Sequence, residues 1–219
     1  MKKTKTVIVI GLGRFGESVA ETLLDLGYEV IGVDENPEVV QKFSSILTYV
    51  VRADTTKEES LKEIGVQNCD AAVVAIGTNV EASIVTAVLL KEMKVPYIIA
   101  KASNNLHEKV LEKIGIDKII HPEKDMGARV AYHIISTSIL DYLHISPELC
   151  LIEIKVPESF YGKSIDEIHF RDKYAVSVAA LKRSNQMIVP PKSQEIMQKD
   201  DLLFLIGEKT RVKKLQFLV

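Results

Sequence analysis

The chain has 219 residues, an apolar content of 47%, a formal net charge of −2 and a pI near 6.2. This length suits one ordinary domain plus a small one, and the charge balance lacks the basic excess of a nucleic-acid-binding protein. The sequence contains no Trp and has an aromatic content of 6%, which argues against stacking platforms for single strands.

The cysteines, the N-terminal segment and the length of the apolar runs indicate the cellular compartment in which the protein is expected. Cys69 and Cys150 lie in no CxxC motif and at no metal-ligand spacing, which favours a reduced, cytoplasmic protein. The basic start MKKTKT precedes a short apolar run that enters a glycine turn, so we expect a first strand and not a signal peptide. No stretch approaches the ~20 apolar residues of a membrane span. Any membrane role is therefore expected to come through a partner.

The segment 6–34 predicts a dinucleotide-binding unit of strand, glycine turn, helix, strand and acid. Gly11 allows a sharp turn at the end of strand 7–10, Gly13 lets a phosphate approach the backbone, and Gly16 lets the helix pack close to the strand. The N–H groups of the first helical turn then face the phosphates. Asp34 follows strand 30–33, where its carboxylate accepts both ribose hydroxyls and disfavours NADP. The alternative is a degenerate Rossmann domain with an empty site.

Arg14 departs from an ordinary dinucleotide turn, which needs no cation at this place. A guanidinium on the first turn of the helix could reach phosphates beyond the pyrophosphate, or those of a nucleotide on a neighbouring subunit. The alternative is a solvated arginine.

Strand and helix patterns continue to alternate as far as residue 120, which predicts a Rossmann-like, doubly wound parallel sheet. Helices are expected after Asn36 and Asp54 and over 80–93 and 104–114. The expected strands are 49–52, 71–76, 97–100 and 118–120. The fourth strand should lie beside the first, at the switch point of the sheet.

Several strands end on residues that could contact a nucleotide, because ligands bind at the carboxyl edge of such sheets. Asp54, with Thr55 behind it, could contact the adenine or simply cap the next helix. Lys101 could reach a phosphate or remain in solvent. The fourth strand ends on small residues that would flank the adenosine, or that serve tight packing alone: Ala75, Ile76 and Gly77.

A long helix is expected from Pro122 to about Leu143, and a helix of ~20 residues spans ~30 Å, enough to leave the domain. Glu123 lies on its first turn at the ligand edge of the sheet. A carboxylate there could hold a divalent cation against nucleotide phosphates, or satisfy the helix N-terminus.

From about residue 145 the pattern changes to a small α+β module. Strands are expected at 150–156, 175–181, 187–189 and 202–206, and helices at 164–168 and 210–217. A module of roughly 70 residues is marginal alone, so it is expected to pair with a copy of itself. The domain prediction is a nucleotide-binding domain at 1–122, a crossover or hinge helix at 123–145 and a C-terminal module at 146–219.

No motif places a Ser/His/Asp or Cys/His set, and the chain has no room for a substrate domain. We therefore predict a nucleotide-binding sensor and not an enzyme. A small dehydrogenase is the minor alternative.

Five segments carry a resemblance to a known family: VIGLGRFGESVA (9–20), VDEN (33–36), VVAIGTNVEAS (73–83), EKVLEKIGIDKIIHPEKDMG (108–127) and RDKYAVSVAALKR (171–183). The chain resembles the RCK (regulator of conductance of potassium) subunits of bacterial Ktr/Trk-type potassium transporters, and above all the cytosolic Ktr gating subunits. The resemblance spans nearly the whole chain.

The resemblance implies an octameric ring of RCK domains, built from dimers, docked on a membrane potassium-pore protein, with ATP favouring the open transporter over ADP. The glycine turn, with Phe15 in it, would hold the phosphates, and Arg14 would sense the terminal phosphate across a subunit boundary. Asp34 and Glu35 would hold the ribose, Lys101 would lie near the phosphates, and Glu123 would bind an activating cation. Cyclic di-AMP would bind the C-terminal module at Ile165, Asp166, Arg171 and Pro191. A sensor of NAD or NADH in a Trk-type transporter is the alternative.

Overall fold

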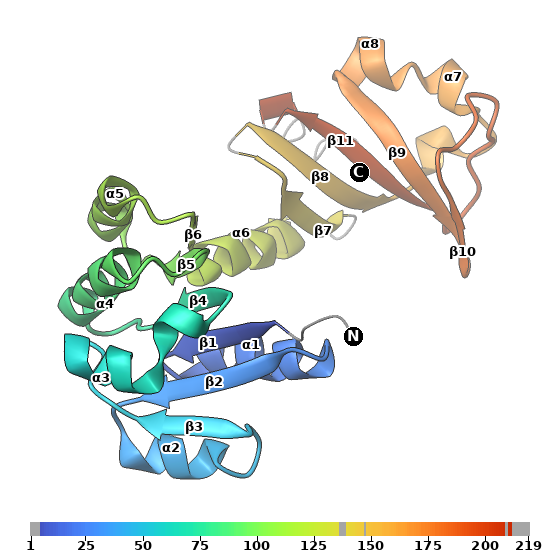
Figure 1. Cartoon of the computed structure of the whole chain (residues 1–219). Coiled ribbons are helices and arrows are strands. Elements are labelled where there is room, and N and C mark those ends of the chain that lie inside the picture. The colour runs from blue at the N-terminus through green and yellow to red at the C-terminus, as the bar shows by residue number, and fades with distance from the viewer. Residues whose placement is uncertain (1–4, 136–138, 147, 209, 212–219) are drawn as a thin grey trace. The chain divides into compact units, whose positions relative to one another are not determined.

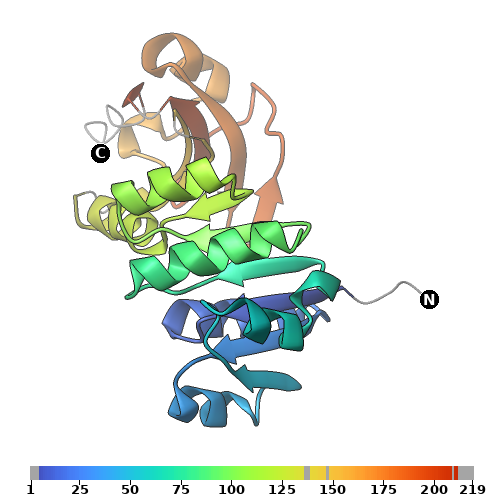
Figure 2. The same cartoon turned by 60° about the vertical axis from the view of Figure 1, so that its left-hand side comes forward.

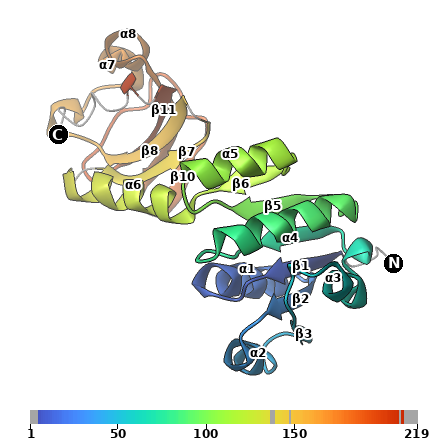
Figure 3. The ribbon, with the colours of Figure 1, turned by 90° about the vertical axis from the view of Figure 1, so that its left-hand side faces the viewer.

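The first strand, β1 (Thr6–Ile10), lies inside a six-stranded parallel sheet with the order β3-β2-β1-β4-β5-β6. The computed structural model describes residues 5–135, 139–146, 148–208 and 210–211. In Figure 3 the labelled strands of this sheet follow one another as β3, β2, β1, β5 and β6. The other strands of this sheet are β2 (Glu29–Asp34), β3 (Tyr49–Arg52), β4 (Ala71–Val74), β5 (Ile98–Lys101) and β6 (Lys118–Ile120). The doubly wound sheet is confirmed, with β1 paired to both β2 and β4 at the predicted switch point.

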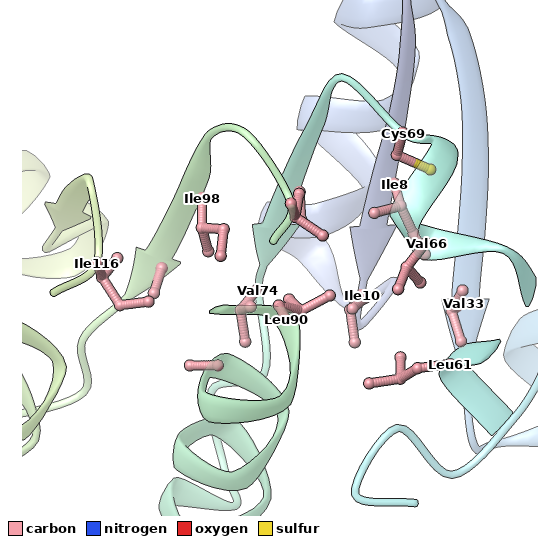
Figure 4. Packing of buried hydrophobic residues seen from close by; sticks show 14 of the residues in the cluster. Ile8, Ile10, Val33, Leu61, Val66, Cys69, Val74, Leu90, Ile98 and Ile116 are labelled. Carbon is pink, nitrogen blue, oxygen red and sulfur yellow. The ribbon is translucent and has the colours of Figure 1, made fainter. Parts of the chain in front are cut away.

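Alternation along β1 divides the core of this sheet into two layers. Ile8 and Ile10 face helices α3 (Glu58–Ile64), α4 (Val80–Glu92) and α5 (Asn105–Ile114), whose Leu61, Leu90 and Leu111 are fully buried there. Figure 4 shows Leu61 and Leu90 gathered against the strand residues, and Figure 2 shows α4 and α5 side by side over the strands. Val7 and Val9 face α1 (Arg14–Asp25) and α2 (Pro37–Phe43) on the other side.

The chain divides into two units, Met1–Pro122 and Glu123–Val219. The second unit contains α6 (Pro122–Ile135) and a five-stranded antiparallel sheet in the order β10-β9-β11-β8-β7, visible with its helices in Figure 1. Its strands are β7 (Ile139–His144), β8 (Leu149–Lys155), β9 (Val176–Arg183), β10 (Gln186–Ile188) and β11 (Leu202–Glu208). Two short helices, α7 (Ile165–Ile168) and α8 (Phe170–Tyr174), contribute buried side chains to the core of this sheet.

The predicted long helix is wrong in its extent. The structure ends α6 at Ile135, and residues 139–144 form the edge strand β7, which pairs antiparallel with β8. Arg129 joins these elements because its Nε and Nη2 donate to the two carboxylate oxygens of Asp141 at 3.0 and 2.9 Å. Pairing with β8 buries Tyr142 and determines the strand. The helix predicted at 210–217 lies largely outside the described residues.

Candidate functional site

The glycine turn is held by close backbone packing at the carboxyl edge of the parallel sheet. Gly11 has a φ of +89°, and a Cβ there would lie 3.1 Å from the Ala75–Ile76 peptide. A Cβ on Gly16 would overlap the Gly11 carbonyl oxygen. Gly13, in contrast, has no protein atom within 4 Å of its Cβ position. Gly11 and Gly16 are thus required by the packing of the fold, whereas Gly13 leaves open space beside the N-terminus of α1.

Asp34, the last residue of β2, is tied to this turn. Its Oδ2 accepts a hydrogen bond from Leu12 N–H at 2.8 Å, and its Oδ1 accepts one from Asn36 N–H at 2.9 Å. Both bonds fix the carboxylate in place. An ionised carboxylate has about four acceptor sites, so it retains capacity for ribose hydroxyls.

An open pocket of about 490 Å³ lies beyond Asp34 and is lined by Glu35, Arg52, Ala53 and Asp54. Arg52 Nε donates to the Glu35 carbonyl oxygen at 3.2 Å. Asp54 Oδ1 accepts from the hydroxyl and amide of Thr56 at 2.6 and 3.1 Å. These two hydrogen bonds lower the pKa of Asp54 below its usual value, with the larger contribution from the Thr56 hydroxyl. The nearby charge of Lys57 lowers it further. The pocket is therefore lined by one basic residue, Arg52, and two acidic residues, Glu35 and Asp54.

The ends of β4 and β5 form the other wall of the turn. Ala75 is buried, and its N–H donates to the Ile10 carbonyl oxygen at 2.7 Å. Ile76 and Gly77 follow, half-buried. Lys101 Nζ lies 3.2 Å from the Cβ position of Gly77 and 6.0 Å from the ring centre of Phe15. The structure thus brings the predicted residues of the fourth and fifth strands to the glycine turn.

Arg14 is the first residue of α1 and is exposed. Within the described part of the chain its side chain makes no hydrogen bond and no ion pair. Thr55 is placed differently, because it is 6% exposed and its hydroxyl shares a 2.8 Å hydrogen bond with Thr86 inside the fold. Its side chain therefore serves packing.

The remaining predicted site residues belong to the second unit. Glu123 is exposed on the first turn of α6. The backbone N–H groups of Ile165 and Asp166 donate to the carbonyl oxygens of Glu195 and Ser193 at 3.1 and 2.9 Å, so α7 begins beside the loop that contains Pro191. Arg171 is exposed on α8.

Sequence reasoning missed Arg52 and Ser103. Arg52 is the last residue of β3 and pairs in register with Asp34, so a strand ending in Arg at the ligand edge was the available signal. Ser103 has its hydroxyl 2.8 Å from the Gly77 carbonyl oxygen, and no motif marks it.

Two kinds of feature are absent from the described residues. They contain no cluster of three or more His, Cys, Asp or Glu side chains that could hold a metal ion. No helix among them is both long enough and apolar enough to cross a bilayer.

Comparison with known proteins supports the family resemblance. Residues 7–122 match the TrkA-N domain and residues 151–218 the TrkA-C domain. The chain is similar to Ktr system potassium uptake protein C of Bacillus subtilis (strain 168), with 41% identity over 212 residues, covering 97% of this chain and 96% of that protein. It is similar to protein A of the same system and organism, with 40% identity over 214 residues, covering 98% and 96%. Protein A of Vibrio alginolyticus is 32% identical over 208 residues, covering 95% and 94%.

Solved structures share the fold. The crystal structure of the GsuK RCK domain has a TM-score of 0.67 and 16% identity, covering all of this chain and 48% of that chain. The structure described as the GsuK channel bound to NAD has a TM-score of 0.69 and 18% identity, covering 99% and 40%. The chain thus spans less than half the length of these solved proteins.

Proposed function

The chain belongs to the family that contains the Ktr system potassium uptake proteins and is built from a TrkA-N and a TrkA-C domain, and on this basis we propose that it is the regulatory subunit of a potassium-uptake system. It binds ATP and ADP at the glycine turn and switches a separate membrane pore subunit. The observation that carries the proposal is the open space at Gly13, next to Arg14 on α1, whose side chain has no partner among the described residues.

The phosphates bind at the glycine turn. Space beside Gly13 admits a phosphate to the first-turn N–H groups of α1, where the helix dipole also favours negative charge. Asp34 holds the ribose, together with Glu35, and the pocket of Glu35, Arg52 and Asp54 receives the adenine. Lys101, beside Gly77, adds positive charge for the phosphates.

Arg14 distinguishes ATP from ADP by contacting the terminal phosphate of a nucleotide held by a neighbouring subunit. A guanidinium suits this task because its planar fork donates several hydrogen bonds to one phosphate. Glu123 supplies one carboxylate to a divalent cation bound with ATP, the usual arrangement for Mg²⁺ in nucleotide sites. Such a cation would neutralise phosphate charge.

The differential contacts of ATP bias the assembly, because a ligand shifts an equilibrium only by its difference in affinity between two states. Moving a ring from mostly closed to mostly open needs about 5.5 kcal/mol of differential binding, which several sites supply together.

We propose an octameric ring of dimers docked on the pore subunit at the cytoplasmic face of the membrane, with segment 123–145 as the hinge. Cyclic di-AMP binds the paired C-terminal modules at Ile165, Asp166, Arg171 and Pro191.

Titration calorimetry of the purified chain with ATP, ADP, NAD and NADH tests the proposal. We expect tighter binding of ATP than of ADP. Arg14→Ala should reduce that preference while ADP affinity stays within about twofold, because ADP lacks the terminal phosphate that Arg14 contacts. The fold should be unaffected, since an exposed side chain contributes little to stability. Equal affinities for ATP and ADP in the unmodified protein would refute the role of Arg14. Measuring the molecular mass of the particle in solution with and without ATP reports the oligomeric state.

A sensor of NAD or NADH is the second candidate. The ties of Asp34 to the turn suit the ribose of a dinucleotide as well as that of ATP. Tighter binding of NAD or NADH than of ATP in the same titration would favour this function.

A further inference from the structure

A short chain of hydrogen bonds connects the start of α5 to the wall of the glycine turn. Ser103 Oγ donates to the Gly77 carbonyl oxygen at 2.8 Å. The backbone N–H of Ser103 in turn donates to His107 Nδ1 at 3.3 Å. Ser103 is exposed, whereas His107 is 1% exposed. The buried ring of His107 therefore helps to position Ser103, and Ser103 in turn positions Gly77.

The protonation of His107 suits this role. Because Nδ1 accepts a hydrogen bond, the proton of the neutral ring is on Nε2, and that buried nitrogen has no partner among the described residues. Burial, and secondarily His121, lowers the pKa of His107. The ring thus stays neutral near pH 7 and keeps Nδ1 as an acceptor.

The bond at Gly77 orients a peptide group at the candidate site. Because a trans peptide is planar, the Gly77 carbonyl facing Ser103 points the Thr78 N–H in the opposite direction. Thr78 is exposed, and no described residue accepts a hydrogen bond from its N–H. The preceding Ala75–Ile76 peptide lies against Gly11, 3.1 Å from its Cβ position. Displacement of Gly77 would therefore be transmitted to the glycine turn.

We propose that Ser103 and His107 are positioning residues of the nucleotide site: they fix the Gly77–Thr78 peptide and the adjoining wall of the glycine turn, and thereby raise nucleotide affinity without touching the ligand. This inference rests on the proposed nucleotide binding. The alternative is that both side chains only cap α5, as Asn104 does by accepting hydrogen bonds from the N–H groups of Leu106 and His107.

The test is calorimetric titration of the full chain with ATP and with ADP, for the unmodified protein and for variants of both residues. Ser103→Ala and His107→Leu each remove one hydrogen bond, and we expect each to weaken binding of both nucleotides about 3- to 10-fold. Ser103→Thr keeps the hydroxyl and His107→Asn keeps an acceptor near the Nδ1 position, so both should bind within about twofold of the unmodified chain. The double variant should be no weaker than the worse single variant, because both act through one path.

Asn104→Ala is the matched control, since it removes the cap of α5 but leaves both bonds of Ser103 in place. Affinity losses as large in Asn104→Ala as in Ser103→Ala would overturn the inference in favour of simple capping. Unchanged affinity in Ser103→Ala, an exposed site where folding is not at risk, would overturn it while leaving the proposed function intact. Failure of the unmodified chain to bind either nucleotide would refute the proposed function, and the inference with it.

Discussion

Gly13→Ala should separate nucleotide binding from folding. The new Cβ meets no protein atom within 4 Å, and Gly13 has φ −67° and ψ −177°, which alanine adopts without strain. Lower entropy of the unfolded chain favours alanine by about 0.4–1 kcal/mol, whereas alanine is a poorer N-cap by a similar amount. The two effects offset, so the melting temperature should move by no more than about 2–4 °C.

Binding should respond much more strongly, because the Cβ occupies the space through which a phosphate approaches the backbone. Loss of one charge-assisted hydrogen bond costs about 1.5–3 kcal/mol, so ATP affinity should fall roughly 10- to 100-fold. Scanning fluorimetry and calorimetry measure the two quantities on the same samples. Gly16→Ala is the contrast, because its Cβ overlaps the Gly11 carbonyl oxygen and should lower the melting temperature itself. Gly13→Ala with unchanged ATP affinity would refute the placement of the phosphates.

Two further predictions concern stability. Arg183 Nε and Nη2 donate to Asp201, which is 1% exposed, so Arg183→Leu leaves a buried carboxylate without its cation and should cost about 3 kcal/mol in urea unfolding. Lys62→Ala, which breaks only the exposed pair with Glu58, should cost under about 0.5 kcal/mol, and equal losses would contradict the argument. The pKa of His107 is lowered from 6.5 by burial, so the unfolded chain binds more protons below that pH, and stability is full above it and declines as pH falls. His107→Asn should therefore melt with a shallower dependence on pH between 7.5 and 5.5 than the unmodified chain, and parallel curves would contradict this.

The parallel sheet was predictable because its signals are local. Strands buried on both faces are short apolar runs, and Asn36, after which a helix was expected, is the N-cap of α2 and accepts a hydrogen bond from a first-turn N–H. Asn79 and Asn104 cap α4 and α5 in the same way. Gly65 and Gly115 end helices with φ near +81°, as glycine after an apolar stripe suggests.

The end of α6 was not predictable by the same means. The apolar residues of segment 130–139 follow helical spacing, yet β7 forms because residues 139–144 pair with β8 and bury Tyr142. Tertiary pairing overrides local propensity here. The hydrogen bond from Ser103 to Gly77 likewise joins residues 26 positions apart, a relation that no local pattern carries.

Asp34 shows how one residue can join the fold to the site. The sequence pattern assigns its carboxylate to the ribose, but the structure gives it a prior task, since one oxygen accepts from Leu12 inside the glycine turn and the other from Asn36 at the start of α2. A carboxylate already fixed by two backbone donors loses little entropy when a ribose binds. In the proposed site this carboxylate would also link the ribose position to the phosphate position, because its Oδ2 accepts a hydrogen bond from Leu12 inside the glycine turn. A ligand that engages both should therefore bind more tightly than either part alone would suggest.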